Sequence, residues 1–440
     1  LYFRNNEIGD FCTLNYVYYF PARVFGPAKA ADNKIRIGSF NLFHLGDNLS
    51  IMKNFDLVAQ ILNQWDVVGA QELMPLPSEY SKDNRKIAKI FGTDQNGNDI
   101  EWTVIEPGYL RLLRALRKLD PSWALIMQPN PEGEGSTGEM AGFYFRTKTV
   151  GLKKFDYCLE QTSGDVRDSA MQANYGCVVR VPEGQRRLMS RSAFAAYFFS
   201  GKFDFVALTA HVRFRPAGPE DRVAQIAELC KNHPNPARCK PSKDEVGRFY
   251  EVKAVVDQMN DIKKATGEDD IIYMGDYNLE LKKSKMPMWE AALAAQPGLR
   301  VYQDDPTTLS VPQQKLASNY DHFIFDPVAT SECSPSTVRV FDFTSHTKKT
   351  KRPVHDAIDA KMTAKARDQM LEEKKEEIAT IIRPQSGTVA SMVRRLSPKE
   401  EESFLKSFRG SLLRMERNSY GAALELMSDH VPIEMECQVD

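Results

Sequence analysis

The sequence predicts a large protein of the mixed α/β class, and three observations support this. Its 440 residues correspond to two or three average domains, or to one large α/β domain with insertions. Hydrophobic residues make up 42% of the chain and charged residues 27%, which is ordinary for a globular protein and sufficient for a sizeable core. Short apolar runs alternate with segments in which apolar residues recur at helical spacing.

The expected elements follow from these patterns in chain order. Residues 35–41 are predicted as a strand, and residues 51–64 as an amphipathic helix because apolar residues recur there every three or four positions. A basic helix over residues 109–119 ends at an Asp-Pro pair, and a capping box at residues 242–245 opens a helix to about residue 264. Further strands are expected over residues 67–71, 123–127, 142–146, 193–199, 203–209, 271–274, 320–325, 338–343 and 431–437.

The segment from residue 346 to residue 427 has much helix signal and little strand signal. Residues 356–382 are rich in Ala, Lys, Glu and Met, and a second capping box begins at Ser397, with proline at the first helical position. A basic run at the start of the segment is either a lid or grip on a phosphate backbone, or a solvated decoration; it comprises Lys348, Lys349, Lys351 and Arg352. The expected organisation is an N-terminal extension over residues 1–34, a main domain of residues 35–345 and 428–440, and a helical insertion over residues 346–427.

Charge and hydropathy narrow the function classes. The formal net charge is −1, which excludes a histone-like polybasic protein, so any nucleic-acid binding must come from a local patch. The longest wholly apolar run, Ala193–Phe199, is much shorter than the roughly 20 residues that a membrane span needs. No stable membrane insertion is expected.

Seven cysteines leave at least one thiol unpaired, and no CxxC zinc spacing occurs. Cys158 could bond to Cys177 and Cys230 to Cys239, although buried free thiols are an equal alternative. The sequence around Ala28 has the form of a signal-peptidase site without a clean apolar stretch before it, so an ordered extension is the preferred interpretation. The possible disulfides favour a secreted or periplasmic protein.

Polar side chains gather at the ends of the predicted strands. Hard divalent cations prefer carboxylate and amide oxygens, so Glu72, with Asp429 and Asn41, is a candidate metal site. A histidine oriented by a carboxylate can take a proton from water, and a second such pair can protonate a leaving group or hold a phosphate oxygen. These residue types suit hydrolysis of a phosphodiester. The full set is Asn41, Gln71, Glu72, Glu139, His211, Asp276, Asn278, Asp321, Asp429 and His430.

Each motif taken alone also has a structural interpretation. The GDYN sequence at residues 275–278 can be only a turn after a strand, and His211 can be a hydrogen-bonded core histidine. No Walker A loop, dinucleotide fingerprint or GxSxG elbow occurs in the chain. The order and strand context of the motifs together therefore carry the functional interpretation.

The order SFN, QE, Glu139, Ser190-Arg191, AH, GDYN, YD and SDH resembles the deoxyribonuclease I-like endonuclease/exonuclease/phosphatase superfamily. The match covers residue 35 to about residue 343, plus residue 428 to the end of the given chain. The segment Glu139–Arg146 and the Ser190-Arg191 pair favour the deoxyribonuclease branch over the sphingomyelinase, inositol-polyphosphate phosphatase and abasic-site nuclease branches. The resemblance implies a four-layered α/β sandwich of two packed, mainly antiparallel sheets with outer helices.

The resemblance also implies a role for each motif residue. His211 would pair with Glu139, and His430 with Asp321, while the assignment of base and acid stays open. A metal, Mg²⁺ first and Mn²⁺ or Ca²⁺ as alternatives, would lie among Asn41, Glu72 and Asp429. The residues implied at the phosphate and the attacking water are Asp276, Asn278 and Arg191.

Three positions depart from deoxyribonuclease I at substrate contacts. Phe43 and Met74 stand where it carries arginines, and Thr137 stands where it carries a tyrosine. We therefore expect a metal-dependent, sequence-tolerant DNA endonuclease that leaves 5′-phosphate products, with its grip on a duplex groove in doubt. The alternatives are a related phosphodiesterase or phosphatase acting on RNA, a sphingolipid or a phosphoinositide, and a catalytically silent binding protein.

Overall fold

A computed structural model of the chain describes residues 33–46, 52–75, 90–93, 99–104, 107–133, 138–159, 175–186, 189–212, 222–231, 233, 235–281, 289–290, 293, 298–344, 360–361, 363–384, 393–395 and 397–439. The strands of the first half are β1 (Lys34–Leu45), β2 (Val67–Leu73), β3 (Ile90–Thr93), β4 (Asp99–Val104), β5 (Trp123–Met127), β6 (Met140–Arg146), β7 (Gly151–Leu152), β8 (Gly176–Val178), β9 (Phe194–Ser200) and β10 (Phe203–His211). Those of the second half are β11 (Ile271–Asp276), β12 (Arg300–Tyr302), β13 (Leu309–Ser310), β14 (Lys315–Leu316), β15 (Asp321–Phe325), β16 (Arg339–Val340), β17 (Ile381–Pro384), β18 (Val393–Arg395) and β19 (Ile433–Gln438). The helices are α2 (Phe55–Leu62), α3 (Gly108–Leu119), α4 (Asp156–Leu159), α6 (Glu183–Arg186), α7 (Arg222–Lys231), α8 (Lys243–Thr266), α11 (Ala364–Thr380), α12 (Pro398–Met415) and α13 (Ser419–Leu426), with 3₁₀ turns η1 (Pro236–Arg238) and η2 (Pro335–Thr337).

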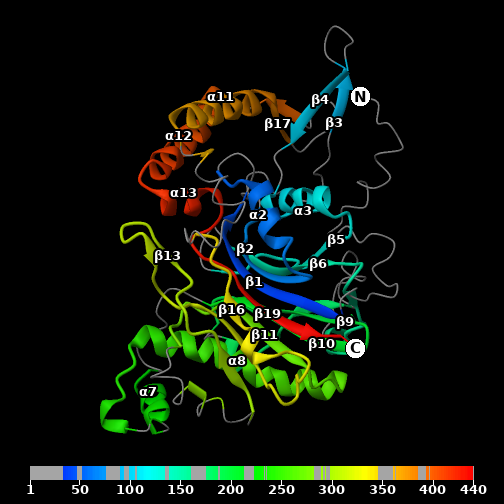
Figure 1. The fold of residues 1–440 in the computed structure, drawn as a ribbon, viewed down its shortest axis with the longest axis vertical. Coiled ribbons are helices and arrows are strands. Elements are labelled where there is room, and N and C mark those ends of the chain that lie inside the picture. Colours follow the sequence, from blue (N-terminus) through cyan, green and yellow to red (C-terminus); the bar gives the residue numbers. More distant parts are fainter. Residues whose placement is uncertain are drawn as a thin grey trace.

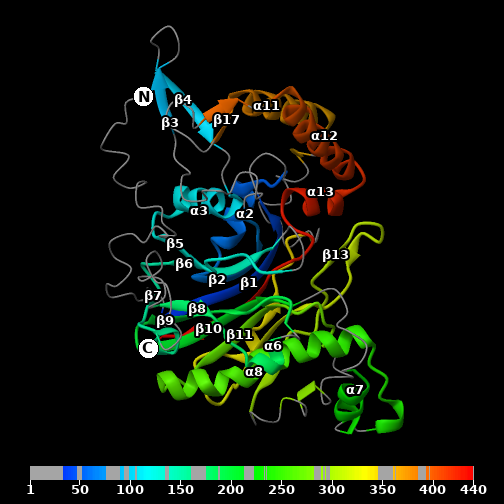
Figure 2. The same cartoon turned by 180° about the vertical axis from the view of Figure 1, so that it is seen from behind.

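Two large sheets form the centre of the molecule (Figures 1 and 2). The first has the strand order β16-β19-β1-β2-β6-β5, and the second has the order β12-β15-β11-β10-β9-β7, with β8 also paired to β9. Within these two sheets, β1 runs parallel to β2 and β10 runs parallel to β11, while every other pair is antiparallel. The predicted class of two mainly antiparallel sheets is confirmed.

The apolar side chains fall into three clusters that match four layers. Ile37 and Phe143 of the first sheet pack against Ala207 and Ile272 of the second in the inner cluster. Helices α2, α3 and α13 bury their apolar faces against the outside of the first sheet, and α8 does so against the second (Figure 1). This arrangement buries both faces of both sheets, as a sandwich flanked by helices requires. None of the helices in the described part of the chain combines the length and apolarity that crossing a bilayer requires.

Helix α2 begins four residues later than predicted. Asn54 caps it, because its side-chain oxygen accepts a hydrogen bond from the N–H of Leu57 at 3.1 Å. This cap satisfies one of the free N–H groups of the first turn, and Asn54 itself has an extended backbone, which ends the helix there. By contrast, the predicted capping box of α8 is present, with Ser242 and Glu245 bonded reciprocally, and so is that of α12.

Two predictions of strand structure need correction. Of the predicted strand 338–343, only Arg339–Val340 is in ladder register with β19, and the N–H of Phe341 still donates to the Pro432 carbonyl at 2.8 Å. Beyond it the Asp342 side chain accepts hydrogen bonds from Thr344 and turns the chain. The second correction concerns the predicted helical insertion, which contains two strands as well as α11, α12 and α13.

These two strands belong to a separate four-stranded sheet, in the order β18-β17-β4-β3. Strand β17 pairs in parallel with β4, placing Ile381 opposite Thr103 (Figure 1). The β-branched run at residues 380–382 suits a strand, but its partner lies nearly 280 positions away, so local composition did not reveal it. The basic run at residues 348–352 lies outside the described residues, and so do residues 1–32 of the extension predicted over residues 1–34.

The described part of the chain contains three disulfides. Cys158 bonds to Cys177 and Cys230 bonds to Cys239, the two pairings that the sequence allowed. The third joins Cys333 to Cys437 across 104 positions, with both cysteines buried in the inner cluster. It ties the final strand β19 to the turn region before β16.

The long disulfide should contribute more stability than a short one, because it removes more entropy from the unfolded chain. Replacing both cysteines of the 104-residue loop with alanine should lower the free energy of unfolding by about 5 kcal/mol, against about 2.5 kcal/mol for the nine-residue loop between Cys230 and Cys239. Urea unfolding of the two double variants measures both values. An equal or larger loss in the short-loop variant would contradict this ranking.

Candidate active site

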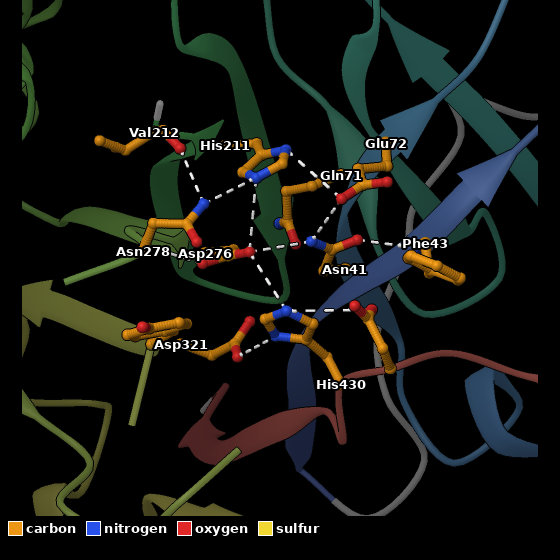
Figure 3. Close-up of polar contacts among 12 residues, drawn as sticks. Asn41, Phe43, Gln71, Glu72, His211, Val212, Asp276, Asn278, Asp321 and His430 are labelled. Carbon is orange, nitrogen blue, oxygen red and sulfur yellow. Dashed lines mark hydrogen bonds and ion pairs between the residues drawn. The ribbon is translucent and has the colours of Figure 1, made fainter. Parts of the chain in front are cut away.

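The site forms where the carboxyl ends of two parallel strand pairs face each other across the sandwich. In the first sheet, Asn41 of β1 lies opposite Gln71 of β2. In the second sheet, the register places His211 of β10 opposite Asp276 of β11, and Asp276 opposite Asp321 of β15. Parallel strands bring their carboxyl ends to the same edge, so these side chains converge (Figure 3).

Irregular pairing in the first sheet directs two of these side chains. The register between β1 and β2 shifts after Asn41, and that between β2 and β6 shifts after Ala70. Phe43, His44 and Glu72 all have positive φ angles, of 44°, 49° and 58°. Each such residue costs about 1–3 kcal/mol, and bulges of this kind turn a side chain out of the regular alternation.

Hydrogen bonds from the strained backbone hold the site residues in place. The N–H of Phe43 donates to Oδ1 of Asn41 at 2.9 Å, and the N–H of His44 donates to Oε2 of Glu72 at 2.7 Å. Asn41 in turn donates from Nδ2 to Oε1 of Glu72 at 3.1 Å. These hydrogen bonds offset part of the cost of the strained backbone, and they orient the Glu72 carboxylate and the Asn41 amide.

A single oxygen connects the two halves of the site. Oδ2 of Asp276 accepts a hydrogen bond from Nδ2 of Asn41 at 2.9 Å. The same oxygen lies 3.5 Å from Nε2 of His211 and 3.4 Å from Nε2 of His430. Both imidazoles thus lie on the same side of the molecule and point at one carboxylate (Figure 3).

Each imidazole has its own carboxylate at the opposite ring nitrogen. Nδ1 of His211 lies 2.7 Å from Oε1 of Glu139, and Nδ1 of His430 lies 2.7 Å from Oδ2 of Asp321. Nδ2 of Asn278 lies 2.9 Å from Nε2 of His211. Because an amide nitrogen donates, this contact suits a neutral His211 whose proton sits on Nδ1, facing Glu139.

The charges around the histidines favour the imidazolium form when no cation is bound. Burial alone would lower the pKa of His211, but the carboxylates of Glu139, Asp276 and Glu72 outweigh it and raise that pKa to about 9. Burial likewise opposes charge on His430, and Asp321 together with neighbouring carboxylates raises the pKa of His430 well above its usual value. The Asn278 amide and the carboxylates therefore favour different protonation states of His211.

The acidic residues next to His430 and Asn41 form the part of the site that suits a cation. Burial would raise the pKa of Glu72, but His211, His44 and Asn41 lower it to about 2, so Glu72 is ionised. The pKa of Asp429 is raised by burial and by the nearby carboxylates. Oδ1 of Asp429 is buried, and no group in the described part of the chain donates a hydrogen bond to it.

Among the residues that the structure describes, two groups of side chains present ligand atoms within 4.8 Å of one another. One contains Glu72, Glu139 and His211, and the other contains Asp276, Asp321 and His430. Of the predicted metal residues, only Glu72 belongs to either group. Asn41 and Asp429 lie beside them, through the contacts of Asn41 with Glu72 and of Asp429 with His430 at 3.9 Å.

The residues predicted at the metal, at the phosphate and in the two histidine pairs belong to one connected network of polar contacts, whereas Gln71 hydrogen-bonds to Ser39, Gly69 and Thr209 instead. Arg191 joins it by pairing through Nε with Oε1 of Glu139, and its Nη1 lies 3.5 Å from the carbonyl oxygen of His211. The guanidinium therefore faces a carboxylate of the site in this structure. Asn278 also has a positive φ, of 48°, and donates from Nδ2 to the Val212 carbonyl at 3.0 Å.

Sequence reasoning missed two residues close to the site, and a third buried histidine lies outside it. Lys53 is buried, donates to the Met427 carbonyl at 2.6 Å, and has its pKa lowered to about 8 by burial against the attraction of Asp429 and Glu72. His44 lies 3.3 Å from Glu72 but is exposed. His322, next to Asp321, instead contacts two backbone carbonyls, and burial lowers its pKa to about 4.

No sequence signal distinguished Lys53, because it precedes a helix cap and belongs to no motif. His44 could have been noted from its place three residues after Asn41, in a chain with only seven histidines.

No protein-family model matches the sequence, and no curated protein does. Solved structures with a similar fold include an endonuclease/exonuclease/phosphatase from Bacteroides vulgatus, at 13% identity and a TM-score of 0.34, covering 70% of this chain and 89% of its own. The human Nocturnin catalytic domain with bound sulfate is similar at 11% identity and a TM-score of 0.36, covering 71% and 91%. TDP2 from D. rerio, complexed with a single-strand DNA product, is similar at 12% identity and a TM-score of 0.36, covering 92% and 98%.

Glu139 should control the charge of His211 in the metal-free protein. The folded pKa of His211, about 9, exceeds its ordinary value of 6.5, so the stability that this histidine contributes is complete below pH 6.5 and is lost as the pH rises to about 9. The contribution is on the order of 3 kcal/mol. Glu139→Gln removes the largest attraction, so the variant should lose less stability between pH 6.5 and pH 9 than the wild type.

Urea unfolding at the two pH values, with NMR titration of the His211 ring, measures this difference. Asp321→Asn is the matched control, because Asp321 pairs with His430 and should leave the titration of His211 nearly unchanged. An unchanged His211 titration in Glu139→Gln would contradict the assignment of this pair.

Proposed function

We propose that this protein is a metal-dependent phosphodiesterase that cleaves DNA without sequence preference and leaves 5′-phosphate ends. The observation that supports it most is the convergence of two imidazoles on Oδ2 of Asp276, each with a separate carboxylate at its far nitrogen. One histidine can accept a proton from water while the other donates a proton to a leaving oxygen. Hydrolysis of a phosphodiester requires both transfers.

The residues present fit a hard divalent cation. Glu72 is ionised, and the buried Oδ1 of Asp429 lacks a donor among the described residues. Carboxylates with an unsatisfied oxygen suit Mg²⁺, with Mn²⁺ or Ca²⁺ as alternatives, and Asn41 lies beside them. When bound, the cation would neutralise charge on a phosphate group.

The chain's own residues supply the proton transfers and the orientation. Glu139 holds His211 through Nδ1, so Nε2, which faces Asn278 and Asp276, is the nitrogen that would accept a proton from a water molecule. Asp321 holds His430 in the same way, which keeps its Nε2 directed at the reaction centre. Asn278 and Arg191 would then contact the phosphate oxygens, with Asp276 between the two histidines.

The residue beside Asn41, Phe43, affects which form of nucleic acid the site could bind. Phe43 is half-buried beside Asn41, and the Lys53 ammonium lies 5.0 Å from the centre of its ring. An aromatic ring in this place cannot make the charged contact to a duplex groove that an arginine would make. We therefore expect duplex and single-stranded substrates to be cleaved at comparable rates.

Replacing either site histidine should nearly abolish cleavage. His211→Ala and His430→Ala each remove a proton-transfer group, so plasmid nicking with Mg²⁺ should fall by about 10²–10⁴-fold. His233→Ala is the matched control, because His233 lies after α7 and, among the described residues, its ring hydrogen-bonds to the backbone of Asn235 and to no residue of the network. Nicking that persists unchanged in His211→Ala would refute the assignment.

The same protein, with Mg²⁺ or with chelator, separates the substrate alternatives. Incubation with plasmid, single-stranded DNA, RNA, sphingomyelin vesicles and phosphoinositide vesicles tests each class in parallel. Cleavage of lipid without cleavage of plasmid would replace the nuclease proposal by the lipid alternative. No turnover on any substrate would favour a binding protein.

Metal binding should stabilise the fold through Glu72. At a Mg²⁺ concentration 100 times the Kd, the free energy of unfolding should rise by about 2.7 kcal/mol. Glu72→Gln should abolish most of this rise, because the ionised carboxylate is lost. Asp56→Asn, at an exposed carboxylate on α2, is the matched control and should keep it. Thermal unfolding with and without Mg²⁺ measures the difference.

A further inference from the structure

A buried polar bridge crosses the sandwich directly beneath the site. Nε2 of Gln71 on β2 donates to Oγ1 of Thr209 on β10 at 2.7 Å, and lies 3.2 Å from Oγ of Ser39 on β1. All three side chains are fully buried. The bridge therefore links the two sheets without contact with solvent.

The three residues of the bridge precede three site residues on the same strands. Glu72 follows Gln71 directly, Asn41 comes two residues after Ser39, and His211 comes two residues after Thr209. A change in the distance between β2 and β10 at the bridge would thus change the 3.7 Å separation between Oε1 of Glu72 and Nδ1 of His211.

The backbones also approach closely at this level. A Cβ atom on Gly69, two residues before Gln71, would lie 2.7 Å from the Met274 sulfur and 3.1 Å from Oγ1 of Thr209. Contacts under 3.0 Å force neighbours to shift. Glycine at position 69 therefore allows β2 to come near enough for the short Gln71–Thr209 hydrogen bond.

The bridge is not an efficient way to stabilise the core. Oε1 of Gln71 is buried, and no described residue donates to it. Buried polar atoms without partners are destabilising, and replacing both members of a buried pair with apolar groups of similar shape is often neutral or stabilising. The contact therefore calls for an explanation other than stability.

We propose that Gln71 is a positioning residue that, through Thr209, holds the Glu72 half of the site in register with the His211 half. The metal-binding and activity measurements that test this inference rest on the proposed function. The claim that the Gln71–Thr209 hydrogen bond fixes the position of Glu72 relative to His211 does not. An amide fits the role because its direction-dependent hydrogen bond fixes one spacing and register, whereas an apolar contact would tolerate several.

The test is the double variant Gln71→Met/Thr209→Val, with Thr147→Val as the matched control. Thr147 is also buried, and its hydroxyl donates to the Ser122 carbonyl. It directly follows β6, at the opposite end of that strand from Glu139. Four measurements are made on the 440-residue chain: the midpoint of thermal unfolding, the Kd for Mn²⁺ by EPR, the ring ¹⁵N shifts of His211 in metal-free protein, and plasmid cleavage.

A positioning role predicts a thermal midpoint that is unchanged or higher, a Kd for Mn²⁺ raised about 10–100-fold, and displaced ring shifts for His211. Plasmid cleavage should fall together with the Mn²⁺ affinity, and Thr147→Val should change neither the Kd nor the ring shifts. A lower thermal midpoint with unchanged Kd and ring shifts would assign the bridge to stability alone and overturn the proposal.

Failure of the proposed function would give a different result. A wild type that neither binds Mn²⁺ nor cleaves any substrate would contradict the proposed function. The ring shifts of His211 would still test the positioning role of Gln71. Unchanged His211 shifts in the double variant would then overturn it.

Discussion

The rest of the site depends on the carboxylate of Asp276, because its Oδ2 is the point at which groups from both sheets meet. Asn41 reaches it from β1, His211 from the neighbouring strand β10, and His430 from the loop before β19. Asp276 is almost completely buried, so its charge needs these partners. A buried anion shared by an amide and two imidazoles fixes their positions more strictly than an apolar contact could.

Holding these groups together lowers the stability of the folded protein. Five carboxylates, Glu72, Glu139, Asp276, Asp321 and Asp429, lie in one connected network, and several backbone angles beside them are strained. Like charges in a buried place repel each other and lose hydration. The large apolar clusters on both faces of each sheet supply the stability that the site lacks, so the cost is confined to one edge of the sandwich.

The segment that carries Asp429 and His430 is anchored by contacts from distant parts of the chain. Lys53 donates to the Met427 carbonyl, the N–H of Asn54 donates to the Leu426 carbonyl, and the Ser428 hydroxyl donates to the Asn41 carbonyl. Helix α13, which precedes this segment, also packs on the first sheet. The last residues of the predicted insertion thus help to position the segment that carries Asp429 and His430.

The local pattern of residues was enough to predict most elements of the two sheets, because alternation and helical spacing are written in neighbouring positions, and the order of the short motifs, with the resemblance it carries, indicated the residues that the fold brings into contact. It did not predict the positive φ angles at Phe43 and Glu72, the burial of Lys53, the pairing of β17 with β4, or the bond between Cys333 and Cys437. Each of these depends on a partner far away in the chain, and its energy comes from packing, burial or a hydrogen bond that exists only in the folded state. Residue types therefore specified the available chemistry, while the approach of the two sheets decided which groups act on one another.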